Sequence, residues 1–193
     1  FGDKYFSMNY IKKTDKYIPT GLFSLTKNQN KVKPRLFNKK NLLITGGNTS
    51  QTIDTLRKVI LNIKTNFLNL FDKIFVDDRL YPSYPINKVE RFKYSKSQFE
   101  QISACICRPG LGILSDCLEN NIRVFTVYEK NNFEMSHNSK IIKKIGAGEK
   151  LELQNCLNLI NFFNNNSLLD DNYRICNLID FNGCSDIYEF LKK

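Results

Sequence analysis

Histidine and closely spaced cysteines are scarce in this sequence, and their scarcity excludes several kinds of site. The chain has one histidine, His137, and none of its six cysteines forms a Cys-x-x-Cys pair, so the spacing of a zinc finger is absent. The apolar runs are all far shorter than the roughly 20 residues that span a bilayer. Neither a helix-turn-helix nor an RNA-recognition signature appears. We therefore expect no bound metal and no nucleic-acid partner.

The composition is that of an ordinary globular protein. With 193 residues, 41% of them hydrophobic and 25% charged, the chain can bury a core as one large domain or one domain with appendages. Cys105 and Cys107 alternate in an apolar run, which predicts small buried side chains and a reduced, cytoplasmic protein. No basic-then-apolar leader opens the sequence. The first residue is Phe1 rather than methionine, so we expect a fragment of a longer chain.

The net charge of +10 has two interpretations. Lysines scattered over a solvated surface would produce it, and so would attraction to nucleotide phosphates, anionic lipid or nucleic acid. Basic residues gather at 30–40 and 140–150, but neither segment is interleaved with aromatic residues as a single-strand binder would be. Both segments fit docking on a membrane surface as well as plain solubility.

The periodicity of apolar residues predicts an α/β fold. Short apolar runs that close on glycine or polar residues are typical of buried parallel strands, and apolar residues at steps of three and four mark amphipathic helices between them. The alternation between 41 and 146 predicts a Rossmann-like, doubly wound parallel sheet with helices on both faces. The expected strands are 41–47, 73–78, 88–94, 104–107 and 123–128, and the expected helices are 50–67, 95–103, 112–121, 136–146, 151–164 and 184–193.

The same pattern divides the chain into three parts. Residues 1–40 lack strong periodicity and read as a remnant and linker. Residues 41–150 hold the expected sheet, and residues 151–193 are expected to form C-terminal helices, the first with Leu153, Leu157 and Ile160 on one face. A loop is expected at 80–86, where two prolines lie close together.

Two of the expected strands end in glycine turns, "TGGNTS" and "CRPGLG". Glycine lets backbone N–H groups approach an anion, and the following helix N-terminus adds unpaired donors and a positive dipole end. A tight strand-to-helix connection needs glycine as well. Neither turn is a P-loop, and the first is not a dinucleotide fingerprint either. Two such turns at one edge of a sheet favour a ligand, because ligands of doubly wound sheets bind beyond the carboxyl ends of the strands.

An acid follows the second turn by about one helical turn. Asp116 can accept two hydrogen bonds from adjacent hydroxyls, as a ribose diol requires, or it can simply complement the helix dipole. Asp77 and Asp78 end another strand and are expected to be solvated loop acids rather than metal ligands.

The stretch "ISACICRPGLGILSDCLENNIRVFTVYEKNNFEMSHNSKIIKKIGAG" resembles the C-terminal half of GT-B glycosyltransferases. More narrowly, it is similar to the family 28 C-terminal domain, the type found in the peptidoglycan N-acetylglucosaminyltransferase. "LLITGGNTS" resembles the opening strand and turn of that domain, and "YIPTGLF" resembles the interdomain segment before it. The resemblance covers about residues 17–150, and the order and spacing of the pieces make it more specific than any one motif.

The resemblance implies a set of donor-binding residues. The first turn would line the donor side of the cleft, and the backbone of the second would meet the diphosphate. Asp116 stands where the family usually has the ribose-binding glutamate, and Glu134 at the acid that contacts the donor sugar. The implied set is Gly46, Gly47, Asn48, Arg108, Gly110, Leu111, Gly112, Asp116, Glu134 and Asn138.

Several positions depart from the family pattern. Asp116 is one methylene shorter than the usual glutamate, Met135 replaces the expected glutamine, and Ser139 replaces the expected alanine. Pro109 replaces a small residue. The sugar pocket is therefore unusual, or the protein no longer transfers sugar. His137 is expected to be a helix-surface or packing residue.

The resemblance implies a domain that binds a nucleotide-diphosphate sugar, with UDP-sugar as the expected donor, and that needs no metal or other cofactor. The acceptor site and the catalytic base would come from a missing N-terminal domain or a partner subunit. The location would be cytoplasmic, with peripheral membrane association left open. Two alternatives remain: a nucleotide-sugar hydrolase or epimerase of the same architecture, and a non-catalytic half-enzyme subunit that needs a partner.

Overall fold

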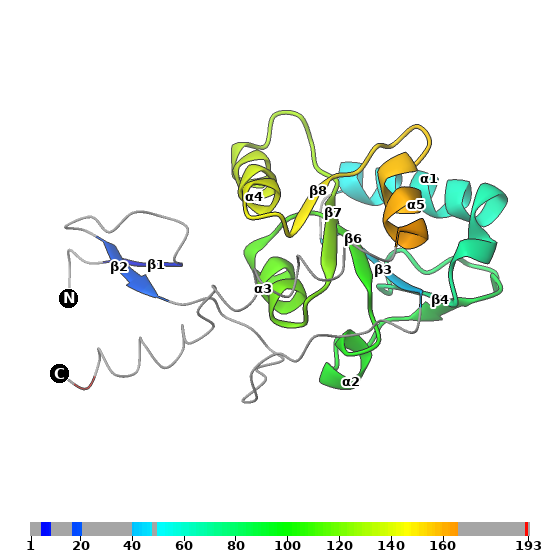
Figure 1. Cartoon of the computed structure of the whole chain (residues 1–193), viewed down its shortest axis with the longest axis horizontal. Helices are drawn as coiled ribbons and strands as arrows, with labels where there is room; N and C mark the ends of the chain where they lie inside the picture. Colours follow the sequence, from blue (N-terminus) through cyan, green and yellow to red (C-terminus); the bar gives the residue numbers. More distant parts are fainter. Residues whose placement is uncertain (1–4, 9–16, 21–39, 48–49, 166–191, 193) are drawn as a thin grey trace.

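The computed structural model describes residues 5–8, 17–20, 40–47, 50–165 and 192 (Figure 1). Its main sheet has six strands, all parallel, in the order β5-β4-β3-β6-β7-β8. The doubly wound parallel sheet predicted from the sequence is therefore confirmed. The strands are β3 (Asn41–Thr45), β4 (Lys73–Val76), β5 (Val89–Arg91), β6 (Ala104–Cys107), β7 (Arg123–Thr126) and β8 (Gly148–Lys150).

Helices cover both faces of this sheet, as Figure 1 shows. One face packs against α1 and α5, and the other packs against α2, α3 and α4. The helices are α1 (Ser50–Asn66), α2 (Lys96–Phe99), α3 (Leu111–Glu119), α4 (Phe133–Lys144) and α5 (Leu157–Asn164), with a short 3-10 helix, η1 (Leu68–Leu70), after α1. None of the helices within the described residues is long and apolar enough to cross a membrane.

Two hydrophobic clusters lie on opposite faces of the sheet, because successive side chains of a strand point to opposite faces. In β3, Leu42 and Ile44 join the cluster under α1 and α5, whereas Leu43 joins the cluster under α3 and α4. All five residues of β3 are buried. Burial on both faces explains why the strands appear in the sequence as short, nearly continuous apolar runs.

The end of α4 shows how one glycine stops a helix. Gly146 adopts φ +76°, a left-handed conformation that favours glycine. Its N–H donates to Lys143 O, and the N–H of Ala147 donates to Ile142 O. This pair of bonds is the Schellman arrangement, and it satisfies carbonyls left over at the helix end. The prediction that Gly146 ends this helix is confirmed, although α4 begins earlier than expected, with the Asn132 side chain accepting from Met135 N.

The prediction of one helix over 151–164 is wrong. Residues 148–150 form strand β8, and α5 begins only at Leu157. The intervening backbone is held by side-chain amides: Asn158 Nδ2 donates to Lys150 O, and Asn155 Oδ1 accepts from Leu157 N. Such local bonds compete with helical ones. The buried face is also different, because Leu153 and Leu157 are 45% and 46% exposed while Leu159, Phe162 and Phe163 are buried.

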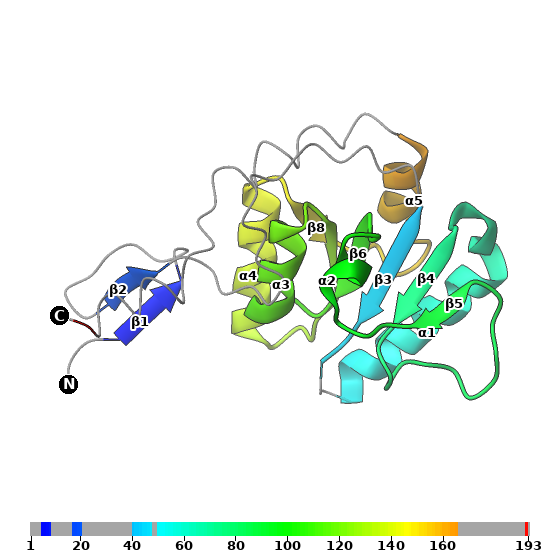
Figure 2. The same cartoon turned by 90° about the horizontal axis from the view of Figure 1, so that it is seen from below.

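Part of the segment expected to be a linker forms regular structure. Strands β1 (Tyr5–Met8) and β2 (Tyr17–Thr20) pair in parallel as a separate sheet of two strands (Figure 2). The expected C-terminal helix at 184–193 and most of the basic segment 30–40 lie outside the described residues. The division of the chain into three parts stays a prediction.

Candidate functional site

The order of the strands places both glycine turns at one point of the sheet. The chain builds β3, β4 and β5 outward in one direction and then returns to place β6 on the other side of β3. This reversal is a topological switch point, where the crevice beyond the strand ends opens. Thr45 and Cys107, the last residues of β3 and β6, are direct partners, so the two turns start side by side.

The glycines of the first turn are explained by the fold itself. A Cβ added at Gly46 would lie 2.7 Å from Leu56 Cδ1 of the buried α1 face, closer than such atoms approach. Gly47 adopts φ +64°, which most side chains disfavour. The first turn therefore needs glycine for packing and for backbone conformation, whether or not a ligand binds there.

The glycines of the second turn have no such explanation. Gly110 is the N-cap of α3 with φ −74° and ψ 148°, and it offers no side-chain cap. A Cβ added at Gly110 or Gly112 would meet nothing within 4 Å. Within the part of the chain that the structure describes, no hydrogen bond uses the N–H groups of Leu111, Gly112 or Ile113, as expected for an uncapped helix start. The helix start thus offers three N–H donors close in sequence to Arg108.

Asn138 holds the second turn from α4. Its Nδ2 donates to Pro109 O at 2.9 Å, and the contact is buried. The next residue of α4, Ser139, lies with its hydroxyl 2.6 Å from Thr126 Oγ1 at the end of β7. Asn138, expected to bind the donor, therefore contacts the backbone of the turn, and its neighbour fixes α4 to the adjacent strand.

Replacing Asn138 by alanine is expected to lower the free energy of unfolding by about 1–2 kcal/mol, because the buried Pro109 carbonyl would lose its donor. Urea denaturation measures the change. The matched control is His137→Ala on the exposed side of the same helix, which should change stability by less than about 0.5 kcal/mol. Equal effects of the two substitutions would contradict this role of Asn138.

Asp77 at the end of β4 is a buried structural acid. One carboxylate oxygen accepts from Thr45 Oγ1 and Gly46 N at 3.0 and 3.1 Å, and the other accepts from Arg79 N and Leu80 N at 3.1 and 3.2 Å. The expectation of a solvated loop acid is wrong for Asp77, because its side chain is buried and its oxygens accept these bonds within the fold. Asp78 is exposed and pairs with Arg91.

The hydroxyl groups of Thr45 and Tyr94 connect Asp77 to a hollow at the ends of the strands. Tyr94 OH lies 2.6 Å from Thr45 Oγ1, and burial raises the pKa of Tyr94 to about 12 against the opposing effect of the Thr45 hydrogen bond. Tyr94 is therefore a neutral phenol at physiological pH. It shares a hollow of about 400 Å³ with residues at the ends of β3, β4 and β5; the lining residues are Gly47, Asp77, Asp78, Arg79, Phe92, Lys93 and Tyr94.

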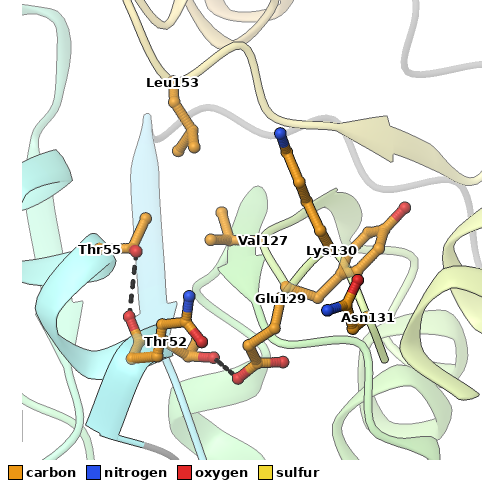
Figure 3. Close-up of a pocket in the computed structure, with 9 residues that line it drawn as sticks. Thr52, Thr55, Val127, Glu129, Lys130, Asn131 and Leu153 are labelled. Carbon is orange, nitrogen blue, oxygen red and sulfur yellow. Dashed lines mark hydrogen bonds between the residues drawn. The ribbon is translucent and has the colours of Figure 1, made fainter. Parts of the chain in front are cut away.

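A larger cleft, of about 440 Å³, opens between the start of α1 and the loop after β7 (Figure 3). Glu129 lies in it with its carboxylate directed at Thr52 of α1, which donates to Oε1. The other oxygen, Oε2, lies 3.4 Å from Arg108 Nε. Sequence reasoning missed Glu129 and Thr52. Thr52 lies in α1, Glu129 follows β7 and Arg108 follows β6, and no motif or spacing connects these three positions.

The remaining predicted residues differ in how far they are exposed to solvent. Asp116 is only 4% exposed within α3, whereas Glu134 is exposed in the first turn of α4 and is not among the residues that line the larger cleft. Met135 is buried. Asn48 lies outside the described residues. The structure thus gathers Gly46, Gly47, Arg108 and Gly110 at one edge of the sheet, and Glu134 lies one helical turn before Asn138, which contacts the second turn.

The thiols near the second turn are buried. Cys105 and Cys107 of β6 are completely inaccessible, as expected from the sequence, and Cys117 of α3 is buried with them. Burial raises the pKa values of Cys105 and Cys117 above that of a free thiol, so these groups are packing residues rather than nucleophiles.

Comparison with known proteins gives structural matches only. No protein-family model matches the sequence, and no curated protein matches it significantly. Among solved structures, spinosyn forosaminyltransferase SpnP matches at 15% identity with a TM-score of 0.64, covering 91% of this chain and 50% of its own. Acinetobacter baumannii MurG matches at 16% identity with a TM-score of 0.60, covering 80% and 50%.

A third match is the glycosyltransferase SsfS6 of Streptomyces sp. SF2575, solved in complex with thymidine diphosphate. It shares 13% identity with a TM-score of 0.58, and the match covers 86% of this chain and 46% of the SsfS6 chain. The chain thus spans about half the length of these structures. At this level of identity the likeness concerns the fold, and the described domain has the Rossmann-like fold of GT-B glycosyltransferases.

Proposed function

We propose that this chain is the donor-binding half of a glycosyltransferase, and that the diphosphate of a nucleotide sugar binds at the start of α3. The observation that carries the proposal is the second glycine turn. Neither backbone conformation nor packing calls for glycine at positions 110 and 112, yet glycine there leaves the N–H groups of the helix start open to an anion. Arg108 lies beside them at the switch point.

The chemistry follows from this placement. When the glycosidic bond of the donor breaks, negative charge grows on the leaving diphosphate. Backbone donors and the positive end of the α3 dipole would stabilise that charge without reorganising, and Arg108 would add a fixed positive charge. The acceptor hydroxyl and the base that activates it would come from the other half of the enzyme, in a second domain or a partner subunit. This chain alone should bind the donor and transfer nothing.

Asp116 and Glu134 have separate proposed roles. Asp116 would accept hydrogen bonds from the ribose hydroxyls, and because it is 4% exposed, contact would use only the edge of the carboxylate or a small movement of α3. Glu134 would reach the donor sugar from the exposed first turn of α4. The cytoplasmic location and any docking of the basic segment 140–150 on a membrane belong to the same proposal.

Calorimetric titration of the full chain with UDP and with thymidine diphosphate tests the proposal. We expect saturable binding of one nucleoside diphosphate, with weaker binding of GDP and CMP. The thymidine arm is included because the similar SsfS6 structure holds that nucleotide. In Asp116→Asn, binding of UDP and of uridine should weaken alike, because both carry the same ribose hydroxyls. A chain that binds none of these nucleotides would not be a donor-binding domain.

A further inference from the structure

We propose that Glu129 is an internal competitor for the donor: its carboxylate occupies Arg108 in the unliganded chain and must leave when a diphosphate binds. The inference rests on the proposed function and adds a conformational step to it. Glu129 lies in the loop after β7, Arg108 follows β6, and Thr52 is in the first turn of α1. One carboxylate therefore links three elements around the switch point.

The contacts of Glu129 are those of an anion in an anion site. Thr52 Oγ1 donates to Oε1, and Arg108 Nε lies 3.4 Å from Oε2. The side chains of Arg108 and Glu129 are only 21% and 16% exposed, so the pair is partly shielded from water. Guanidinium groups bind carboxylates and phosphates with the same donors. A carboxylate on Arg108 thus uses a group that a diphosphate at the second turn would need.

The geometry also indicates that this contact can be broken. At 3.4 Å the pair is longer than the roughly 2.7–2.9 Å of a strong charge-assisted hydrogen bond. The cleft around Glu129 holds about 440 Å³, which gives the side chain room to turn. Lys130, the next residue, is exposed and extends away from Glu129 along the cleft wall (Figure 3).

A cost in affinity follows from this arrangement. A diphosphate brought to the start of α3 would repel the Glu129 carboxylate at short range, and the repulsion would be strong because the site is partly desolvated. The chain must therefore populate a state in which Glu129 has turned away before it binds tightly. The apparent affinity equals the affinity of the competent state multiplied by the fraction of molecules in that state.

The test compares Glu129→Gln with the unmodified chain, using UDP, thymidine diphosphate and inorganic pyrophosphate as probes. Glutamine keeps the size of the side chain and removes its charge. We expect the variant to bind diphosphates about fivefold more tightly, with a gain that shrinks as salt is raised. Affinity for the uncharged nucleosides uridine and thymidine should be unchanged, because they carry no phosphate to compete with Glu129.

The control is Glu100→Gln, an exposed acid that follows α2 and leads toward the opposite end of β6. It removes the same charge and should leave diphosphate affinity within error. Circular dichroism checks that both variants are folded, and Glu129→Ala repeats the charge removal without an amide. If the unmodified chain binds a diphosphate and Glu129→Gln and Glu129→Ala bind it equally or more weakly, the competitor role is overturned while the proposed function stands. If neither the chain nor any variant binds a diphosphate, the proposed function itself fails.

Discussion

Substitution of Gly148 by alanine is expected to lower the free energy of unfolding by about 3 kcal/mol or more, because a side chain there has no space. A Cβ at this position would lie 2.1 Å from Val124 O, 2.8 Å from Val124 C and 2.8 Å from Ile142 Cγ2. The first two atoms are backbone of the paired strand β7, which cannot move aside as a flexible side chain would. Strand β8 would have to separate from β7, and the packing of α4 against β8 through Ile142 would be disrupted.

Urea denaturation of Gly148→Ala measures this loss directly. Gly112→Ala is the matched control, because the same added methyl group meets nothing within 4 Å at that position. The comparison separates the steric effect at β8 from the general effect of replacing glycine. A midpoint for Gly148→Ala equal to that of the unmodified chain would mean that β8 is not packed against β7 as described.

The double substitution Gly110→Ala with Gly112→Ala is expected to separate stability from binding. Folding should be preserved, and Gly112→Ala alone should add roughly 0.5–1 kcal/mol of stability, because alanine is the better helix former. Diphosphate affinity should nevertheless fall by about thirtyfold or more, since two methyl groups would occupy open space at the helix start, where the diphosphate is proposed to bind. A substitution that raises stability but weakens binding is rare at a structural residue and indicates a residue that serves a ligand.

Thermal unfolding and titration with nucleoside diphosphates, carried out on the same preparations, measure both quantities. Ser97→Ala in α2 is the control, since it replaces a small exposed residue by alanine and should not affect diphosphate affinity. Unchanged affinity in the double variant would remove the second glycine turn from the binding site. A strong loss of stability would instead mean that the turn needs glycine for its conformation.

The sheet was predictable from the sequence for a physical reason. Strands buried on both faces must be apolar throughout and must end in turn residues, so β3, β4, β6 and β7 appear directly as apolar runs such as "NLLIT" and "ACIC". The error after residue 150 has a physical reason as well. Leucines at 153 and 157 have the spacing of a helical face. The side chains of Asn155 and Asn158 hydrogen-bond to the nearby backbone instead, and α5 begins only at Leu157.

The candidate site was predictable only in part. Arg108, Gly110 and Gly112 lie within five consecutive residues, so one short stretch of sequence identifies them as a turn. Glu129 could not be found in the same way, because its role depends on how β7 is placed beside β6 and α1. Charged residues carry no periodic signal, and an exposed acid such as Glu134 has the same appearance in a sequence as a shielded one.

The position of β3 in the middle of the sheet has a consequence for synthesis of the chain. One edge of β3 pairs with β4, which follows after α1 and η1. Its other edge pairs with residues 104–107 of β6, which are synthesised much later. Until β6 leaves the ribosome, a buried apolar strand presents unpaired N–H and C=O groups, the kind of edge that recruits other strands. Non-local pairing of this sort also slows folding. The nascent chain is therefore expected to be most prone to non-native strand pairing before β6, on the far side of the switch point, has been made.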